Sequence, residues 1–540
     1  MNTSEETSGR PTDDEGRRAD DQRPGGAADH RPGGAAGERR DARGHQRGAA
    51  RVEGRGHRSA AAPSQRARTG DPAREVAYDT LRAVDSSDAY ANLVLPPLLR
   101  ERRLDTRDAA FATELAYGTL RLRGRYDAVL AQCVDRPLER LDPPVLDVLR
   151  LGAHQVLGMR VPPHAAVSQT VALARERVGQ GSAQLVNAVL RRVTERSVEE
   201  WLDAIAEAAD PTGADLVARL AVVESHPTWV VRALREALVG NGRDAAELVA
   251  LLRADNASPR VSLVARPGLI TPDELAAQAG DGARGLLATT AVQLAGGDPG
   301  RLPAVHDGYA AVQDEGSQVV ALALAAAPLD GGPDERWLDL CAGPGGKAAL
   351  LAALAAQRGA RLVAVEPAAH RARLVVEALA AVPAGAVEEV RTADGRSVGD
   401  DEPGGYDRVL VDAPCTGLGA LRRRPEARWR RSPTDLTALG SLQRALLASA
   451  LAAVRPGGVV AYVTCSPHLA ETRLVVTDAL RAAARAGTPA EVLDARAVVV
   501  GLVPPGAPTP DLPDRPDVQL WPHVHGTDAM HLTLLRRSTS

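Results

Sequence analysis

The sequence predicts an α/β protein whose C-terminal part is a parallel sheet with helices on both faces and whose N-terminal part is all helical. Three observations lead to this prediction. From residue 337 onward, short apolar runs alternate with helical segments, which is typical of strand–helix–strand units. Acidic residues and cysteines follow the ends of these runs. Residues 71–200 instead show helical spacing of apolar residues, without the two-residue period of strands.

The composition excludes several classes of protein. The chain has 540 residues, 44% hydrophobic and 25% charged, with a formal net charge of −4. No window approaches about 18 uninterrupted apolar residues, and the N-terminus lacks the apolar core of a signal peptide, so we expect neither a spanning helix nor a leader. Four cysteines in so long a chain do not form a disulfide framework. We therefore expect a reduced, cytoplasmic protein. We also expect a monomer.

Residues 1–70 differ in composition from the rest of the chain. They hold only Met1 and Val52 as sizeable apolar residues, repeat the hexapeptide RPGGAA, and carry 14 Arg against 11 acidic residues. So few apolar side chains cannot offset the entropy lost on ordering, so we predict a disordered Arg/Gly-rich tail. Two interpretations stay open: an arm that contacts RNA, or a solvated segment without a partner.

Helical spacing predicts an all-helical domain over residues 71–200. Asp71 is a capping residue and Pro72 is a first-turn proline, so together they mark the start of a helix. The pattern then continues through apolar segments that lack strand alternation. Further buried helices are predicted at residues 144–154, 165–174 and 185–193.

Two segments connect this domain to the predicted sheet. Residues 201–225 read as a helical connector. An alternating run at residues 258–266 indicates a strand, and short helices and strands follow it. We therefore predict a small α+β segment over residues 226–305.

Residues 306–540 carry the strand–helix alternation. In parallel sheets of this kind, ligands bind outside the carboxyl ends of the strands. A candidate functional residue follows each predicted strand, so these residues are expected at one edge of the sheet. The predicted strands are 337–340, 361–365, 406–411 and 459–463, and the residues that follow them are Cys341, Glu366, Asp412 and Cys465.

A glycine-rich turn, residues 341–347, follows the first of these strands. Glycine lets backbone amides approach a ligand closely, and the N-terminus of the next helix favours negative charge. Lys347 is the only lysine of the chain, which has 64 arginines. A lysine at this position, in a chain that otherwise uses Arg, indicates that the lysine itself is needed here. Glu366, 19 positions later, suits a ribose diol. The turn indicates a nucleoside-containing cofactor, and the alternative is glycines needed only for packing.

Cys415 and Cys465 each lie on a loop that leaves a predicted strand, in the runs Asp412-Ala413-Pro414-Cys415 and Thr464-Cys465-Ser466. A buried cysteine is usually an inert small apolar residue. At the ligand-binding edge of a sheet, a thiol can instead be a nucleophile if its surroundings favour the thiolate. The residues alone leave both interpretations open.

A basic stretch follows Cys415, because residues 421–431 contain six Arg and Trp429. Arg binds phosphates and stacks on bases, and Trp offers a stacking surface. The stretch therefore indicates contact with RNA, and the alternative is a solvated Arg-rich loop.

Three of these loops resemble those of a known family. Residues 341–347, 412–415 and 464–466 resemble the three signature loops of the Sun-type RNA cytosine-5 methyltransferases. Residues 312–318 look like the segment that precedes the cofactor-binding strand of this family, and residues 521–528 look like its C-terminal motif. Three ordered loops are far more specific than a single motif.

The helical region resembles a second family. Residues 71–195, with the run Val186-Asn187-Ala188-Val189-Leu190-Arg191, resemble a NusB-like RNA-binding domain. The combination of the two resemblances is similar to the bacterial small-subunit ribosomal RNA enzymes of the Sun-type family. It covers about residues 75–540.

The resemblance implies a Rossmann-type S-adenosylmethionine-dependent methyltransferase domain at residues 306–540, preceded by the all-helical NusB-like domain. It implies methylation of cytosine carbon 5 in small-subunit (16S) ribosomal RNA, with S-adenosylmethionine as cofactor and RNA as partner. No metal and no membrane is implied. The small α+β segment is then expected to bind RNA.

The resemblance also implies roles for individual residues. Cys465 would be the nucleophile that adds to carbon 6 of the base, and Cys415 would assist release. Glu366 stands where the family more often has Asp, and its longer arm suits the same role. The implied cofactor-binding residues are Cys341, Ala342, Gly343, Pro344, Gly345, Gly346 and Lys347 at the methionine part, Glu366 at the ribose, Asp394 on the adenine side and Asp412 at the cofactor or base.

Three alternatives stay open at this point. The chain would be a non-catalytic RNA-binding or antitermination factor if its second half were degenerate, which the intact loops disfavour. A nucleotide-dependent oxidoreductase on the same fold is disfavoured by the absence of G-x-G-x-x-G. A cytosine-5 enzyme acting on DNA or tRNA is disfavoured only by the NusB-like region, which is an argument from family likeness.

Overall fold

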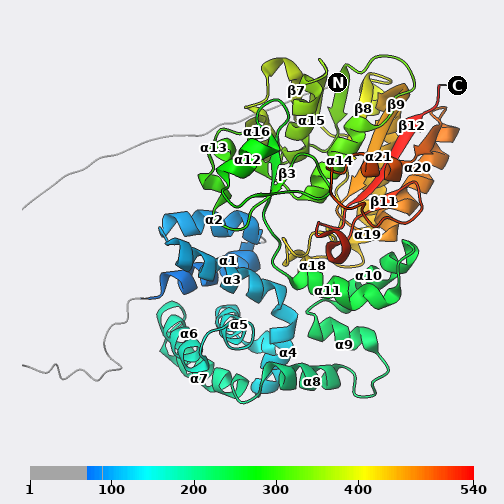
Figure 1. The fold of residues 1–540 in the computed structure, drawn as a ribbon. Coiled ribbons are helices and arrows are strands. Elements are labelled where there is room, and N and C mark those ends of the chain that lie inside the picture. Colours follow the sequence, from blue (N-terminus) through cyan, green and yellow to red (C-terminus); the bar gives the residue numbers. More distant parts are fainter. Residues whose placement is uncertain (1–69, 88, 540) are drawn as a thin grey trace, which may run out of the picture. The chain divides into compact units, whose positions relative to one another are not determined.

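The computed structural model describes residues 70–87 and 89–539, so the predicted disordered tail lies outside the described residues except for its last position. Eleven α-helices precede the first strand of the described chain, and the first nine are drawn in blue to green-cyan in Figure 1. The helices predicted at 144–154, 165–174 and 185–193 are all present. Their bounds are α1 Pro72–Ser87, α2 Ala91–Glu101, α3 Thr106–Arg121, α4 Arg123–Cys133, α5 Pro143–Leu157, α6 Pro163–Arg177, α7 Gln180–Val193, α8 Val198–Ala209 and α9 Leu216–Val223.

These helices enclose a hydrophobic core of their own. Leu115, Leu149 and Leu190, from α3, α5 and α7, are fully buried in one cluster. Each such side chain contributes about 1.5–3 kcal/mol by leaving water. Trp201 of α8 packs against the same cluster, and its indole nitrogen donates to the carbonyl of Val193 at 2.9 Å. Apolar burial and helix propensity therefore agree in this part of the chain.

A small antiparallel sheet follows, with strand order β2-β3-β1-β4. The strand predicted at residues 258–266 forms β1 in the interior of this sheet. Its neighbour β4 comes from beyond residue 305, so the sheet extends past the predicted α+β segment. The bounds are α10 Thr228–Gly240, α11 Leu248–Asn256, β1 Ser262–Ala265, α12 Pro272–Gln278, β2 Ala283–Arg284, β3 Ala291–Gln293, α13 Pro303–His306 and β4 Ala310–Val312.

The larger sheet has strand order β10-β12-β9-β8-β5-β6-β7, and β11 pairs with β12. The four strands predicted in this region form β5, β6, β8 and β9, and with β7 they are parallel. The strands of the C-terminal segment are antiparallel, so the sheet is mixed rather than wholly parallel. The strand bounds are β5 Arg336–Asp339, β6 Arg361–Val365, β7 Val387–Arg391, β8 Tyr406–Asp412, β9 Val454–Thr464, β10 Ala490–Leu493, β11 Val518–Gln519 and β12 His531–Arg537.

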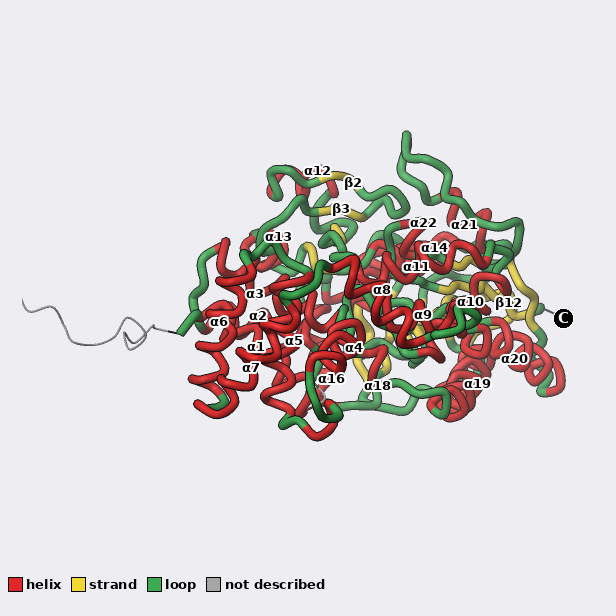
Figure 2. Tube along the Cα trace, turned by 90° about the horizontal axis from the view of Figure 1, so that it is seen from below, coloured by secondary structure: helices red, strands yellow, loops and turns green. Residues whose placement is uncertain are grey.

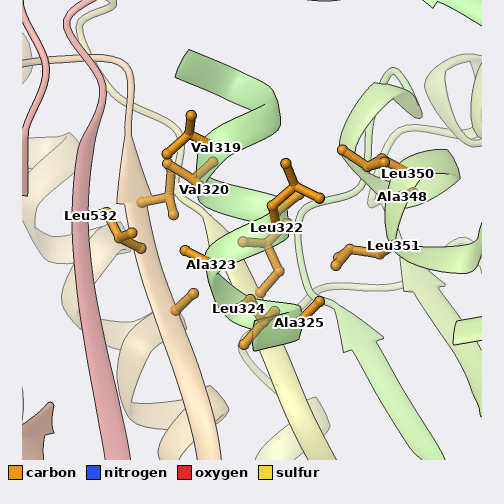
Figure 3. Packing of buried hydrophobic residues seen from close by; sticks show 14 of the residues in the cluster. Val319, Val320, Leu322, Ala323, Leu324, Ala325, Ala348, Leu350, Leu351 and Leu532 are labelled. Carbon is orange, nitrogen blue, oxygen red and sulfur yellow. The ribbon is translucent and has the colours of Figure 1, made fainter. Parts of the chain in front are cut away.

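Helices cover both faces of the larger sheet, because its central strands are apolar on both sides. On β5, Trp337 belongs to the cluster beneath α14, α15 and α21, and Leu338 belongs to the cluster beneath α19 and α20. Figure 3 shows α14 from close by, with its apolar side chains between α15 and Leu532 of β12. The helix bounds are α14 Glu315–Ala326, α15 Gly346–Ala356, α16 Ala369–Leu379, α17 Val398–Asp401, α18 Ala427–Arg430, α19 Asp435–Ala453, α20 Arg473–Arg485, α21 Ala495–Gly501 and α22 Pro522–His525.

Among the described residues, α19 alone is long and apolar enough to pass a length-and-composition test for a membrane span. Its residues Leu446, Leu447, Ala450 and Leu451 belong to the core cluster on one face of the sheet. Figure 2 shows α19 beside α20, which covers the same face. The apolar character of α19 is therefore used for packing against the sheet.

Candidate active site

The residues predicted to carry chemistry lie along the carboxyl-terminal edge of the parallel strands. β5 is the point at which the strand order reverses, because the chain runs outward through β6 and β7 and then returns to β8 on the other side of β5. Open α/β sheets bind ligands at such a point. Along the edge, the order is Cys465 after β9, Asp412 and Cys415 at the end of β8, residues 341–347 after β5, Glu366 after β6 and Asp394 after β7.

The loop between β5 and α15 leaves no room for side chains at two of its glycines. Gly345 has a φ of +113°, and a Cβ there would lie 2.6 Å from the Cβ of Ala378 on α16. A Cβ at Gly343 would collide with Oε2 of Glu366. Glycine is therefore required at Gly345 for the close approach of the loop to α16, whereas a side chain at Gly343 would have to displace the carboxylate of Glu366.

Glu366 is buried at the end of β6 and is held on both carboxylate oxygens. Its Oε1 accepts a hydrogen bond from the backbone N–H of Ala368 at 3.0 Å, and its Oε2 lies 3.3 Å from the guanidinium of Arg371. Arg371 also donates to the carbonyl of Gly343 at 2.6 Å. Arg371, which the sequence prediction did not include, thus links the glycine loop to Glu366.

Lys347 joins the glycine loop to the end of β8. Its Nζ lies 2.8 Å from Oδ2 of Asp412. Burial lowers the pKa of Lys347, but the charge of Asp412 and the hydrogen bond between them outweigh it and raise the pKa overall. The single lysine of the chain is therefore a charged ammonium group that holds a carboxylate at the ligand-binding edge.

Cys415 and Cys465 face each other across the ends of β8 and β9. Their sulfur atoms are 3.3 Å apart, which is a hydrogen-bond distance for thiols and longer than the roughly 2.05 Å of a disulfide. Both cysteines are free and partly exposed. The structure therefore brings together the two thiols that the sequence placed on separate loops.

The two thiols differ in their tendency to ionise. The hydrogen bond with Cys415 lowers the pKa of Cys465, burial and Asp412 oppose this effect, and Arg424 and Lys347 add to it. The same hydrogen bond raises the pKa of Cys415 well above its usual value, together with burial and the negative charges of Cys465 and Glu471. The pair therefore favours a thiolate on Cys465 and the proton on Cys415, and the thiolate is the nucleophilic form.

Two predicted residues stand apart from these contacts. Asp394 is half exposed, and its carboxylate accepts hydrogen bonds from Arg396 at 3.0 Å. Cys341 lies in the glycine loop, but burial raises the pKa of its thiol well above the usual value. Its backbone N–H donates to Asp339 at 3.3 Å, so Cys341 contributes main chain rather than a reactive sulfur.

Two buried polar side chains that the sequence prediction missed lie beside the glycine loop. Asp339, the last residue of β5, is fully buried, and its Oδ2 has no hydrogen-bond partner among the described residues. Burial and the charge of Asp412 raise the pKa of Asp339 to about 7. Both polar atoms of the buried Gln313 amide also lack a partner in the described part of the chain, and a Cβ on Gly346 would lie 3.8 Å from its Oε1. An acidic residue inside an apolar strand, directly before a glycine turn, was the available signal for Asp339.

The basic stretch 421–431 is used mainly inside the protein. Arg428 is fully buried and donates to the carbonyl of Ser225 at 2.9 Å and to Oδ1 of Asn256 at 2.8 Å. Arg430 donates to the carbonyls of Val84 and Ala89. The prediction of a surface that faces RNA or solvent is therefore wrong for Arg428, because buried carbonyl groups of the helical part required a donor.

The same stretch joins two segments singled out in the sequence. Arg422 lies 2.9 Å from Oδ2 of Asp314 and 3.4 Å from Oδ1 of Asp528. The backbone N–H of Asp528 donates to Oδ1 of Asp314 at 3.1 Å. Residues 312–318, 421–431 and 521–528 thus meet in one buried ionic network.

Comparison with known proteins finds family models that match two parts of the chain. The family model described as 16S rRNA methyltransferase RsmB/F matches residues 326–536, and the NusB family model matches residues 71–195. A Mycobacterium tuberculosis protein that is named as a methyltransferase, without a stated substrate, is 52% identical over 474 residues, which is 88% of this chain and 98% of the relative.

Relatives with more specific names are also similar to the chain. The Ribosomal RNA small subunit methyltransferase B of Pseudomonas putida is 33% identical over 417 residues, covering 75% of this chain and 87% of the relative. The solved crystal structure of PH0851 is similar in fold, with a TM-score of 0.69 and 19% identity over 87% of this chain and 99% of that one. The chain therefore belongs to the RsmB/F family of 16S rRNA methyltransferases and carries an N-terminal NusB-family domain.

Proposed function

We propose that this protein methylates carbon 5 of a cytosine in small-subunit ribosomal RNA through a transient covalent bond between Cys465 and carbon 6 of the base. The thiol pair is the observation that carries the proposal: the two sulfurs are 3.3 Å apart at the ligand-binding edge, and the proton is favoured on Cys415. Carbon 5 of cytosine is a poor nucleophile, and covalent addition of a thiolate at carbon 6 activates it.

S-adenosylmethionine is the cofactor that we propose for the loops after β5, β6 and β7. When bound, it supplies a methyl group on a positively charged sulfur. We propose that residues 341–347 hold its methionine part, that Glu366 holds its ribose and that Asp394 lies on the adenine side. Asp412, held by Lys347, ends β8, which lies between β5 and the strand β9 that leads to Cys465. The unpartnered oxygen of Asp339 and the unpartnered amide of Gln313 fit a ligand with several polar groups at this place.

In this proposal, Cys465 performs the covalent steps on the base. The thiolate of Cys465 attacks carbon 6 and forms a C–S bond, and the electron pair of the C5–C6 double bond moves toward carbon 5. Carbon 5 would then bond to the methyl group as the methyl–sulfur bond of the donor breaks and leaves a neutral thioether, so that carbon 5 carries both a hydrogen and a methyl. Removal of this hydrogen as a proton re-forms the double bond, breaks the C–S bond and returns the thiolate to Cys465. One proton is released to solvent overall.

We propose that Cys415 takes the proton from carbon 5. The first cause of its raised pKa is the hydrogen bond with Cys465, and this cause disappears when Cys465 becomes a thioether. Cys415 then loses its proton to water more readily, and its thiolate accepts the proton of carbon 5. When Cys465 departs as a thiolate, the pair regains its starting state. This role corresponds to assistance in release.

The proposed substrate follows from the relatives and from the geometry of attack. Relatives of this chain are named as small-subunit ribosomal RNA methyltransferases, and a NusB-family domain precedes the catalytic part. A thiol can reach carbon 6 only if the base is unstacked, so we propose a cytosine in single-stranded or loop RNA. We propose that residues 71–200 and the α+β segment at 226–305 bind this RNA, and that 201–225 connects them.

Incubation with methyl-labelled S-adenosylmethionine tests the proposal. Unmethylated small-subunit ribosomal RNA and tRNA are offered in parallel, and the labelled RNA is digested to nucleosides. We expect label in 5-methylcytidine from the ribosomal RNA. Label in a different nucleoside would refute the carbon-5 chemistry, and label in tRNA alone would refute the substrate.

A further inference from the structure

A buried carboxylate holds the loop that carries Cys415. Glu471 is fully buried in η6 (Leu469–Glu471), the short 3₁₀ helix that follows the Cys465 loop. Its Oε1 accepts a hydrogen bond from the backbone N–H of Thr416 at 2.8 Å, and its Oε2 accepts one from the Thr416 hydroxyl at 2.5 Å. Glu471 therefore binds the residue directly after Cys415 with both oxygens.

The residue before Cys415 is held by the same group of side chains. Gln443 of α19 donates from Nε2 to the carbonyl of Pro414 at 2.8 Å and to Oε1 of Glu471 at 3.2 Å. The backbone on both sides of Cys415 is thus fixed by two side chains that come from different elements. Little freedom is left for the direction in which the Cys415 side chain points.

The same network reaches the Cys465 loop. The hydroxyl groups of Thr416 and Ser466 lie 3.1 Å apart, and the hydroxyl of Tyr462 donates to the carbonyl of Glu471 at 2.7 Å. The backbone N–H of Gly419 donates to the carbonyl of Cys465 at 2.8 Å. These bonds fix the two loops against each other and account for the short distance between the thiols.

We infer that Glu471 is a positioning residue that fixes Cys415 against Cys465 and keeps the shared proton of the thiol pair on Cys415. The inference rests on the proposed function, because it assigns what makes the two cysteines chemically different. A residue of this kind touches neither base nor cofactor and acts through Cys415.

The distribution of charge around the pair supports this inference. The groups that act on Cys415 include Cys465, Glu471 and Tyr462, each of which carries negative charge when it ionises. The donors to the carboxylate of Glu471 are the backbone and hydroxyl of Thr416 and the amide of Gln443, all neutral, and no ion pair with it is found among the described residues. His468, a further titratable group on which Glu471 acts, has its pKa lowered by burial. Lys347 and Arg424 instead act on Cys465. Asp412 opposes these two cations at Cys465. The pair is nevertheless asymmetric, because Lys347 and Arg424 favour a thiolate on Cys465 and Glu471 disfavours one on Cys415.

The inference is tested by the pH dependence of alkylation. In the full-length protein with Cys465→Ser, which removes the coupling between the thiols, the rate of iodoacetamide modification of Cys415 is followed by mass spectrometry against pH. We expect a midpoint above the usual thiol value of about 8.5. Adding Glu471→Gln is expected to lower this midpoint by about one pH unit, since it removes a buried charge next to Cys415. Adding Glu471→Asp instead, which keeps the charge, is expected to leave the midpoint high.

Gln443→Leu is the matched control, because it loosens the same loop and retains the charge of Glu471. We expect it to leave the midpoint nearly unchanged. An equal fall in Gln443→Leu and Glu471→Gln would overturn the inference, since loop rigidity alone would then explain it. A midpoint at or below about 8.5 with Glu471 intact would also overturn it, even if Glu471→Gln failed to fold. These results do not depend on methyl transfer, so they are distinguishable from failure of the proposed reaction.

Discussion

At the scale of single residues, the site depends on a few charges held close to sulfur. Lys347 and Asp412 form an ion pair that is mostly withdrawn from solvent, and both groups influence Cys465. Lys347 favours the thiolate of Cys465, and Asp412 opposes it. The ammonium group therefore has two functions in our account: it orders the edge of the cofactor loop and it stabilises the nucleophile.

Replacing Lys347 by Met should weaken both functions. We expect the affinity for S-adenosylmethionine, measured by calorimetry, to fall at least tenfold, which corresponds to about 1.4 kcal/mol. The pH midpoint for alkylation of Cys465 should rise, because a positive charge that lowers its pKa is removed. Arg481→Met, on the exposed face of α20, is the control and should change neither quantity. Unchanged values in Lys347→Met would contradict the role assigned to this residue.

Sequence reasoning predicted that the candidate residues lie at one edge of the sheet, because they follow strands in recognisable runs. Cys415, Cys465, Lys347 and Asp412 lie together in the structure as that reasoning predicted. Glu471 was missed because a lone Glu six positions after a cysteine carries no pattern, and only the fold shows that its carboxylate is buried against Thr416. Burial in three dimensions is the property that a linear pattern does not contain.

At the scale of elements, the turn between β5 and α15 fixes where a ligand can approach. Gly345 adopts a left-handed conformation directly against α16, so two different costs apply to a side chain there. One is the strain of the backbone, and the other is the collision with Ala378. Gly359, just after α15, also has a positive φ of +72°. A Cβ at this position would meet nothing within 4 Å beyond its chain neighbours. A substitution at Gly359 therefore measures the backbone strain without the collision.

Gly359→Ala should therefore cost about 1 kcal/mol of stability from backbone strain alone. Gly345→Ala should cost about 2 kcal/mol more, because α16 must also move. Urea denaturation followed by circular dichroism measures both values. Equal losses in the two variants would show that the loop has more room than this packing implies.

The elements themselves were predicted with uneven success, for physical reasons. The strands β5, β6, β8 and β9 are buried on both faces and read as apolar runs, so they were found. β7 contains Glu388 and Glu389 at the margin of the sheet and gives no such run. The antiparallel strands β10 and β12 pair with residues that are distant in sequence. They do not belong to a strand–helix repeat, so the alternation that predicted the other strands does not predict these two.

At the scale of the whole described molecule, Arg428 connects the catalytic part to the helical part. It lies in α18, and its guanidinium binds backbone and side-chain oxygens from residues 121, 225 and 256. Nearby, both carboxylate oxygens of the buried Asp255 lack a hydrogen-bond partner within the described residues. Burial raises the pKa of Asp255 to about 7, although Arg428 acts to lower it. A buried carboxyl group at this junction makes stability depend on pH.

The sign of this dependence follows from the raised pKa. In the folded protein Asp255 prefers to be protonated, so its stabilising contribution is complete below the unfolded pKa near 4 and is lost as pH rises through about 7. An asparagine at position 255 cannot ionise, so Asp255→Asn removes the loss of stability that occurs as the pH rises. We expect the variant to gain on the order of 2 kcal/mol relative to wild type between pH 5 and pH 8, measured by urea denaturation at each pH. A constant difference between the two proteins over this range would contradict the raised pKa.

The central claim is that Cys465 bonds to the base and that Cys415 permits its release. Its most direct test is a denaturing gel of the Cys415→Ala protein incubated with S-adenosylmethionine and small-subunit ribosomal RNA, followed by mass spectrometry of the trapped peptide. The account predicts an RNA adduct that survives denaturation and maps to Cys465, and its absence from the Cys415→Ala/Cys465→Ala double variant. An adduct mapped to any other residue, or full turnover by Cys465→Ala, would contradict the account.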